Sequence, residues 1–226
     1  MSYQWQAGGA VDMPVGKLVC VGRNYAAHAR ELGNDVPDAP IIFLKPSTAA
    51  VALMPEFALP VGRGECHYET EITLLMGQRL SATDGHDASP VSALQAREAI
   101  AGIGLGLDLT LRDLQNQLKA KGQPWELAKA FDGAAPLSPF LPIAADTDLA
   151  ALTFSLDING QRRQSGNSAD MIADMIALLQ FITRYITLLP GDVVMTGTPA
   201  GVAALHTGDE LNLQLSEQAS WHTRVR

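Results

Sequence analysis

Two glutamates one residue apart, Glu69 and Glu71, lie inside a strand-like stretch at 65–76 whose second half is largely apolar. Glu69 and Glu71 are followed by Thr-Leu-Leu-Met at 73–76, a run that favours a strand ending before Gly77. Because side chains alternate along a strand, both carboxylates are expected to project from one face. Burying either carboxylate without a neutralising partner would cost on the order of several kcal/mol, and a divalent cation would remove that cost. The simpler alternative is a solvent-facing strand edge with two unrelated acids.

A third acid, Asp108, lies in a second apolar run at 99–110 and is a candidate third oxygen ligand. Three carboxylates without a cysteine or a close histidine pair favour a hard ion, Mg²⁺ or Mn²⁺, over zinc. The sequence therefore contains a candidate metal site of Glu69, Glu71 and Asp108.

Composition restricts the class of protein. The chain has 226 residues, 47% of them hydrophobic, and a formal net charge of −8, which suits one globular domain (17–226) with an N-terminal lead segment (1–16). No basic block is present, so nucleic acid is not an expected partner. The longest apolar run, at 171–189, is interrupted by polar residues and does not predict a membrane span. No signal peptide is evident, and Cys20 and Cys66 make no disulfide framework, so we expect a cytoplasmic protein.

Strand patterns outnumber helix patterns and do not alternate with them as βαβ units would. Strands are expected at 17–21, 41–44, 65–76, 103–109, 152–158, 162–164, 193–196 and 210–215. Helices are expected at 24–32, in part of 88–100, at 110–121 and, as the one long helix, from about 169 to 185. Asn-Gly at 159–160 predicts a hairpin turn. The whole pattern predicts a β-rich α+β fold with mixed strand pairing.

His28 and Glu31 are three residues apart on an expected helix, so their side chains are neighbours on one face. Glu31 could orient and polarise the imidazole, which would then take a proton from water. The alternative is a surface salt link worth roughly 0.2–0.5 kcal/mol.

Lys45 and Lys129 each stand among apolar residues, where a lysine either extends its ammonium group to solvent or lines a pocket for an anion. Arg112 and Gln115 follow Asp108 and offer hydrogen-bond donors to a carboxylate, although a surface helix would look much the same. Thr198 lies in a glycine-containing loop that lets the backbone approach a ligand, or forms an ordinary tight turn.

Glycines at 102, 104 and 106 superficially resemble a dinucleotide-binding loop. They lie within a strand-like run rather than at the start of a helix, and the third glycine has the wrong spacing. We therefore do not expect a dinucleotide site.

Seven motifs in order make the chain similar to the fumarylacetoacetate hydrolase family, in its small single-domain branch of acylpyruvate hydrolases and oxaloacetate decarboxylases. They are Val-Gly-Arg-Asn-Tyr at 21–25, Phe-Leu-Lys-Pro-Ser at 43–47, His-Tyr-Glu-x-Glu at 67–71, Asp108 with Arg-Asp-Leu-Gln at 112–115, Lys-x-Phe-Asp at 129–132, Pro-Gly-Asp at 190–192 and Thr-Gly-Thr-Pro-x-Gly-Val at 196–202. The resemblance runs from about residue 17 to 215. The chain departs from the family pattern at 62–65 and 125–128, which bears on the substrate rather than the metal site.

The resemblance implies a mixed-sheet β-roll of the fumarylacetoacetate hydrolase C-terminal domain type, a homodimer, and Mg²⁺ or Mn²⁺ on Glu69, Glu71 and Asp108. It also implies 2-oxo acid substrates that chelate this ion. The site residues that it implies are His28, Glu31 and Lys129 for catalysis and Arg23, Lys45, Arg112, Gln115 and Thr198 for substrate binding.

The activity expected first is hydrolysis of a C–C bond in a 3-acylpyruvate. His28, assisted by Glu31, would activate water, and the metal would stabilise the departing pyruvate enolate. Lys129 and Arg112 would add positive charge where negative charge develops. The alternatives are isomerisation, tautomerisation or decarboxylation of 2-oxo diacids such as oxaloacetate or 2-hydroxyhepta-2,4-dienedioate. A non-catalytic protein that binds a metal or a 2-oxo acid is a further alternative.

Overall fold

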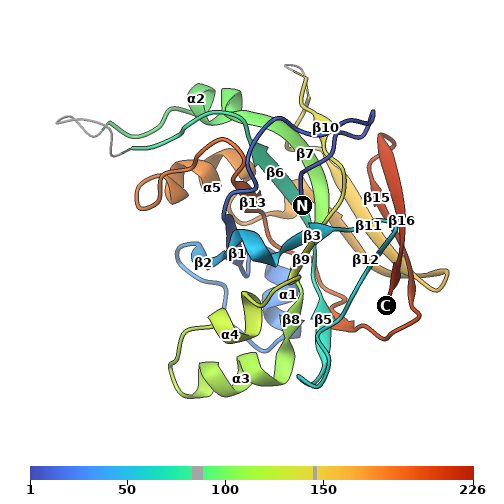
Figure 1. Cartoon of the computed structure of the whole chain (residues 1–226). Coiled ribbons are helices and arrows are strands. Elements are labelled where there is room, and N and C mark those ends of the chain that lie inside the picture. The colour runs from blue at the N-terminus through green and yellow to red at the C-terminus, as the bar shows by residue number, and fades with distance from the viewer. Residues whose placement is uncertain (83–88, 145–146) are drawn as a thin grey trace.

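Three β-sheets form most of the fold in the computed structural model, which describes residues 1–82, 89–144 and 147–226 (Figure 1). The largest sheet has the strand order β2-β1-β13-β6-β7-β9-β3, and β10 pairs with β7. Its strands are β1 (Leu18–Gly22), β2 (Ile41–Lys45), β3 (Ala50–Ala52), β6 (Thr70–Met76), β7 (Ile100–Leu107), β9 (Ala135–Leu137), β10 (Leu141–Pro142) and β13 (Val193–Met195). Pairing is mostly antiparallel, with β1–β13 and β3–β9 parallel, as the predicted mixed pairing requires.

Two smaller sheets complete the strands that the structure describes. The second sheet has the order β12-β11-β15-β16-β4, and the third has the order β14-β5-β8. Their strands are β4 (Glu56–Phe57), β5 (Cys66–Tyr68), β8 (Thr110–Leu111), β11 (Thr153–Ile158), β12 (Gln161–Asn167), β14 (Ala203–Ala204), β15 (Glu210–Leu215) and β16 (Ala219–Val225). The β11–β12 hairpin turns at Asn159 and Gly160, both with positive φ, which confirms the predicted turn.

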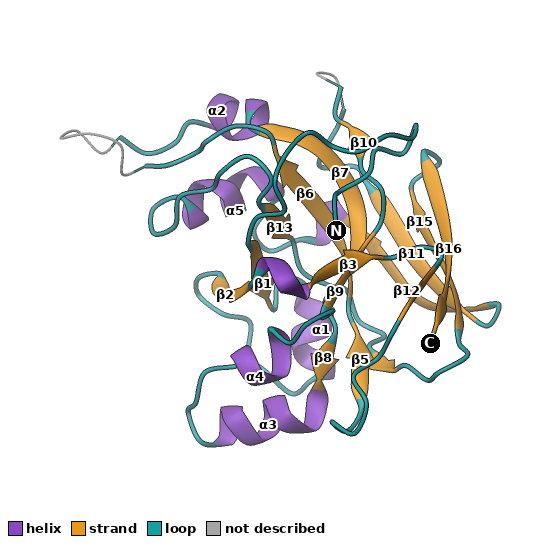
Figure 2. Ribbon diagram, viewed as in Figure 1, coloured by secondary structure: helices purple, strands orange, loops and turns teal. Residues whose placement is uncertain are grey.

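Helices are short and lie at two ends of the large sheet (Figure 2). They are α1 (Ala26–Glu31), α2 (Ala93–Glu98), α3 (Arg112–Ala120), α4 (Glu126–Lys129) and α5 (Met175–Ile182), with 3₁₀ turns at Ser47–Ala49 and Ser168–Asp170. Helices α3 and α4 contact each other, and α4 also contacts β2 and β8, whereas α2 contacts α5. None of the described helices has the length and apolarity that crossing a membrane would need.

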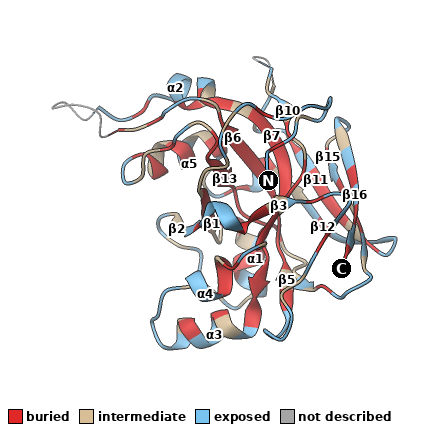
Figure 3. Ribbon diagram, viewed as in Figure 1, coloured by how far each residue is buried: buried red, intermediate tan, exposed pale blue. Residues whose placement is uncertain are grey.

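The large sheet is covered on both faces, and its central strands are buried along their length (Figure 3). Alternation along β1 sends Val19 and Val21 into the larger hydrophobic cluster, while Leu18 and Cys20 face the smaller one. That smaller cluster includes Tyr3, so residues from the N-terminal segment cover this second face. Strand β7 carries the three glycines that resemble a dinucleotide loop, and they pack inside the sheet.

The prediction of one long helix from 169 to 185 is wrong. The chain forms a 3₁₀ turn capped by Asn167, becomes extended, and starts α5 only after Asp174. The cause is Asn24, which lies about 150 residues away in the sequence. Its backbone oxygen accepts from Ile172 N (2.8 Å) and its side-chain oxygen from Ala173 N (2.8 Å). These bonds occupy the amides that a continuous helix would use.

The acidic strand expected at 65–76 is divided at Glu69. Strand β5 ends at Tyr68 and β6 begins at Thr70, and the two belong to different sheets. At the break, the backbone oxygen of Glu69 accepts a hydrogen bond from Asp108 N (2.8 Å), where β7 has just ended. The corner that separates the two sheets therefore brings two acidic residues together.

Two further boundaries differ from the sequence expectation. The helix expected in 88–100 begins at Ala93 after a capping box at Ser92, and residue 88 lies outside the described residues. The predicted helix at 110–121 begins only at Arg112, because Thr110 and Leu111 pair with β5.

Strand β16 was not predicted, although Trp221, Thr223 and Val225 alternate with polar residues as a half-buried strand requires.

Candidate active site

The three acids of the candidate metal site converge in the interior. One carboxylate oxygen from each of Glu69, Glu71 and Asp108 lies within 4.8 Å of the others, and all three residues are buried. Glu69 lies at the β5–β6 break and Glu71 on β6, where it is paired with Gly106 of β7. Asp108 follows β7. The pairing of two central strands, and the corner at their ends, thus build the cluster.

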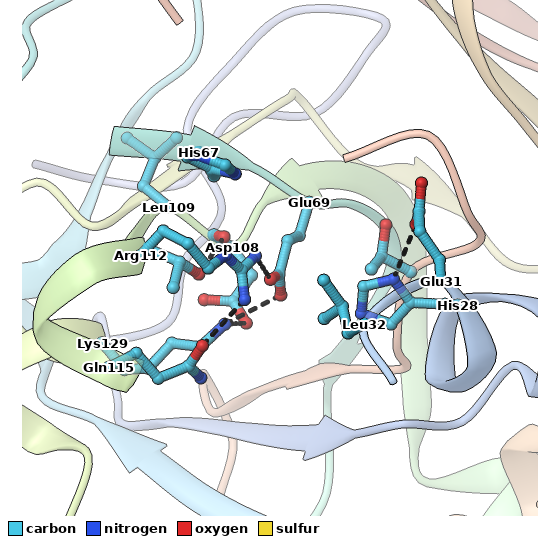
Figure 4. Close-up of polar contacts among 12 residues, drawn as sticks. His28, Glu31, Leu32, His67, Glu69, Asp108, Leu109, Arg112, Gln115 and Lys129 are labelled. Atoms are coloured by element: carbon cyan, nitrogen blue, oxygen red, sulfur yellow. Dashed lines mark hydrogen bonds and ion pairs between the residues drawn. The ribbon is translucent and has the colours of Figure 1, made fainter. Parts of the chain in front are cut away.

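Two cationic side chains bind Glu69, and one of them also binds Asp108 (Figure 4). Lys129 Nζ lies 2.8 Å from Glu69 Oε2 and 2.6 Å from Asp108 Oδ2. Arg112 donates to Glu69 Oε1 and, through Nη1, to Gln115 Oε1 at 2.7 Å. In this view Arg112 and Lys129 lie on one side of Glu69 and His28 lies on the other.

Lys45 completes the charge balance from behind the cluster. Its ammonium group lies 2.8 Å from Asp108 Oδ1 and donates to the backbone oxygens of Leu109 (3.2 Å), Lys129 and Ala134 (3.0 Å). Lys45 is fully buried and is not part of the cleft wall. This placement favours a role in holding Asp108 over the substrate contact that the sequence suggested.

The carboxylates differ in how well their charges are compensated. Burial alone would raise the pKa of Glu69, but the charges of Lys129 and Arg112 outweigh it and hold that pKa below its usual value. The pKa of Glu71 is raised by burial and by the neighbouring charges of Asp108 and Glu69. Glu71 Oε2 accepts a hydrogen bond from the backbone amide Gly197 N (2.8 Å), and among the described residues no cation pairs with this carboxylate.

This donor set fits a divalent ion. Among the residues that the structure describes, Glu71 is a buried carboxylate without a cationic ion-pair partner, and one oxygen of each of two more carboxylates lies within 4.8 Å of its own. Oxygen-only ligands suit Mg²⁺ and Mn²⁺. Glu69, Glu71 and Asp108 are therefore the residues that would hold the ion.

A small cleft opens beside the three carboxylates and encloses about 440 Å³ of space, part of it open to solvent. Most of the residues expected from the sequence to act at the site line it. They are Arg23, His28, Glu69, Glu71, Asp108, Arg112, Gln115, Lys129 and Thr198. Of the remaining two, Lys45 lies behind Asp108, and Glu31 lines an adjoining cavity that shares Leu32, Arg112 and Lys119 with the cleft.

His28 and Glu31 form a pair at the edge of this cleft. His28 Nδ1 lies 3.5 Å from Glu31 Oε2, and both oxygens of Glu31 accept from Gly201 N, at 3.0 and 3.1 Å. Burial lowers the pKa of His28 despite the nearby charges of Glu69 and Glu31. The imidazole is therefore neutral at pH 7 and able to accept a proton.

Asn24 and Gln164 position the loop at 196–202 beside the site, a role that was not predicted from the sequence. Gln164 Oε1 accepts from Thr70 N (3.0 Å), while Nε2 donates to Thr198 Oγ1 (2.8 Å) and Pro199 O (3.0 Å). Asn24 Nδ2 donates to Thr196 O (2.9 Å). Gln164 thus ties the loop at 196–202 to the start of β6, and Asn24 ties Thr196 to the segment after β1. Only the tertiary contacts reveal these roles, because neither the motif that contains Asn24 nor the surroundings of Gln164 in the sequence indicate the partner of the amide.

Comparison with known proteins identifies the family. The model of the fumarylacetoacetate (FAA) hydrolase C-terminal domain matches residues 17–226. The chain belongs to the fumarylacetoacetate hydrolase family. This confirms the predicted family and fold type.

Three members of the fumarylacetoacetate hydrolase family show how similar the relatives are. An oxaloacetate tautomerase of Escherichia coli strain K12, YcgM, is 47% identical over 213 residues, 93% of each chain. The mitochondrial oxaloacetate tautomerase FAHD1 of Bos taurus is 39% identical, covering 86% of this chain and 84% of its own. A crystal structure of fumarylpyruvate hydrolase from Pseudomonas aeruginosa, in complex with Mn²⁺ and pyruvate, superposes with a TM-score of 0.89 at 34% identity, covering 100% of this chain and 95% of that one.

These relatives favour the alternative activity over the first expectation. The family consists of enzymes, and the two sequence relatives are named as oxaloacetate tautomerases rather than C–C bond hydrolases. The Mn²⁺ in the Pseudomonas structure agrees with a divalent ion at the acidic cluster. The cytoplasmic location, the homodimer, the division at residue 17 and the role of each site residue remain predictions.

Glu71→Gln is expected to stabilise the metal-free protein at neutral pH. A carboxyl whose pKa is raised in the folded state binds its proton more tightly there than in the unfolded chain. The free energy of unfolding of the parent should therefore fall as pH rises above the ordinary value of 4.5. The amide removes this dependence. In thermal melts with EDTA, Glu71→Gln should melt higher than the parent at pH 8, by roughly 2–4 °C per kcal/mol, and the gap should shrink at pH 5.

Glu217→Gln removes an exposed carboxylate and is the matched control. Its melting temperature should equal that of the parent at both pH values. The same melts with added Mn²⁺ test the ligand assignment. Mn²⁺ should raise the melting temperature of the parent and of Glu217→Gln but not of Glu71→Gln. An equal rise in all three proteins would show that Glu71 is not a ligand.

Proposed function

We propose that this protein is an oxaloacetate keto–enol tautomerase that works with Mg²⁺ or Mn²⁺ held by Glu69, Glu71 and Asp108. The observation that carries the proposal is the 47% identity to the Escherichia coli oxaloacetate tautomerase over 93% of both chains. The buried acidic cluster and the neutral imidazole beside it supply chemistry that suits this reaction.

Charge supports a dianionic substrate. The cluster contains three carboxylates and three cations, Lys45, Arg112 and Lys129, and the cations pair with Asp108 and Glu69. A divalent ion added to this balanced set leaves the site positive, which favours a molecule with two carboxylates such as oxaloacetate. When bound, the ion would polarise the 2-oxo group and make the adjacent methylene more acidic.

Tautomerisation moves a proton from C3 of oxaloacetate to its 2-oxo oxygen. His28 is the group in the cleft that can accept this proton, because its imidazole is neutral and Glu31 holds it in place. Lys129 has a different role. Its pKa is raised because Asp108 and Glu69 outweigh the effect of burial, so it remains a fixed positive charge and hydrogen-bond donor rather than a base.

Hydrolysis of an acylpyruvate is the second candidate function. It is favoured by the similarity to fumarylpyruvate hydrolase, whose structure covers the whole of this chain. In that reaction the same His28 would take its proton from water rather than from the substrate. Decarboxylation of oxaloacetate would not need His28 to take a proton from water or from C3, because the C–C bond breaks with loss of CO₂ and without attack by water.

The proposed function is tested by following the conversion of enol-oxaloacetate to the keto form by ultraviolet absorbance, with the uncatalysed rate subtracted. Activity should disappear on treatment with EDTA and return with Mg²⁺ or Mn²⁺. Product analysis with acetylpyruvate, fumarylpyruvate and oxaloacetate separates the candidates, since tautomerisation conserves mass. Hydrolysis of an acylpyruvate without any tautomerase activity would contradict the main proposal. Full activity in protein shown to be metal-free by elemental analysis would contradict the metal requirement.

His28→Ala should separate proton transfer from the rest of the site. Tautomerisation, and acylpyruvate hydrolysis if present, should slow by roughly 10²–10⁴-fold, the usual contribution of a positioned general base. Oxaloacetate decarboxylation should fall much less. Mn²⁺ affinity should be nearly unchanged, because His28 is outside the carboxylate cluster. His206→Ala, at an exposed histidine, is the control. Equal losses in all reactions of His28→Ala would point instead to substrate positioning.

A further inference from the structure

A second set of cations lines the cleft and does not contact the acidic cluster. Arg23 and Lys119 both contribute to the wall, Arg23 from the segment after β1 and Lys119 from the last turn of α3. Within the described ranges, neither forms an ion pair with an acidic side chain. The Lys119 ammonium donates a hydrogen bond to Asn34 Oδ1 (3.1 Å), and Asn34 also lines the cleft.

These cations lie close enough to repel one another. The pKa of Lys119 is lowered, first by burial and then by the positive charges of Arg23 and Arg112. Like charges gathered in one cleft are unfavourable unless an anion joins them. A carboxylate placed between Arg23 and Lys119 would relieve this repulsion and gain charge-assisted hydrogen bonds.

The backbone at Arg23 gives an independent indication. Its φ is 59°, in the left-handed region, where a side chain costs about 1–2 kcal/mol and glycine is the usual residue. Gly22 stands immediately before it, yet the strained position carries an arginine that faces the cleft. Strained residues of this kind concentrate at ligand-binding sites.

The cations of the acidic cluster are not available for a distant group. Lys129 is shared between Glu69 and Asp108, while Arg112 binds Glu69 and Gln115. A ligand whose first carboxylate and 2-oxo group lie at the cluster therefore needs other donors for a second carboxylate. Arg23 and Lys119 are the cleft residues with positive charge to spare.

Building on the proposed function, we propose that Arg23 and Lys119 bind the second carboxylate of a 2-oxo dicarboxylate, with Asn34 positioning the lysine. This subsite selects diacids over 2-oxo acids that end in an uncharged group. An uncharged end would leave both cations uncompensated in a partly buried cleft, and sites built for a polar group reject analogues that lack it.

The test is a binding measurement that does not depend on turnover. Racemic malate and racemic 2-hydroxybutanoate have four carbons each and differ by one carboxylate in place of a methyl group. Their dissociation constants are measured by calorimetry on the Mn²⁺-loaded parent and on Arg23→Gln, Lys119→Met and Lys119→Gln. Lys119→Gln removes the charge but retains a hydrogen-bonding group near Asn34. Lys121→Met, which removes an exposed lysine two residues further on, is the charge-matched control.

The parent should bind malate more tightly than 2-hydroxybutanoate. Each variant at Arg23 or Lys119 should weaken malate binding by roughly 10- to 100-fold, the range for a lost charge-assisted hydrogen bond, and change 2-hydroxybutanoate binding less than twofold. Lys121→Met should behave as the parent does. Equal weakening of both ligands, or of neither, would overturn the subsite.

This outcome is separable from that of the proposed function. A selective loss of malate binding in a protein without tautomerase activity would support the subsite and contradict the proposed reaction. Tautomerase activity in the parent, together with unchanged malate binding in the Arg23 and Lys119 variants, would support the proposed reaction and contradict the subsite.

Discussion

The buried cluster of three carboxylates and three cations is the interaction on which the rest of the structure depends. Each cation comes from a different element: Lys45 from the end of β2, Arg112 from the start of α3 and Lys129 from the end of α4. Removing one partner of a buried ion pair commonly costs about 3–5 kcal/mol, because the other charge is left in the interior. Because this cost opposes separation of the charges, the ion pairs hold α3 and α4 against the end of the large sheet.

The same cluster supports the proposed action on a 2-oxo acid. Its charges balance in number but not in position, because Glu69 and Asp108 take the cations and Glu71 receives a backbone amide. The imbalance leaves room for a divalent ion at one side, and the neutral imidazole of His28 lies at the same cleft. The proposed metal position and the proposed proton acceptor are thus located by the two strands β6 and β7 and by the short helix α1.

The sequence predicted features that rest on local patterns. The strand-like run at the end of β6, the Asn-Gly hairpin and the convergence of three acids all follow from neighbouring residues or from strand pairing. Features that depend on distant contacts were not predictable. Asn24 stops the long helix expected at 169–185, and backbone oxygens from three separate segments bind Lys45.

The choice of reaction is also beyond local patterns. Hydrolysis and tautomerisation would use the same proposed metal ligands and the same His28–Glu31 pair, and decarboxylation the same ligands, so the motifs do not distinguish the three reactions. In the subsite proposed above, substrates would be separated by Arg23 and Lys119 in the wall of the cleft. Lys119 belongs to none of the seven motifs, and the motif at 21–25 that contains Arg23 does not indicate which group this side chain binds.

The most direct test of the central claim is Mn²⁺ binding to Asp108→Asn, measured by electron paramagnetic resonance titration. The variant keeps the size of the side chain and removes one of the three negative charges. We expect one tightly bound Mn²⁺ per chain in the parent and an affinity at least roughly 100-fold weaker in the variant, more than a supporting residue commonly contributes. Undiminished Mn²⁺ binding by a folded Asp108→Asn protein would contradict the central claim.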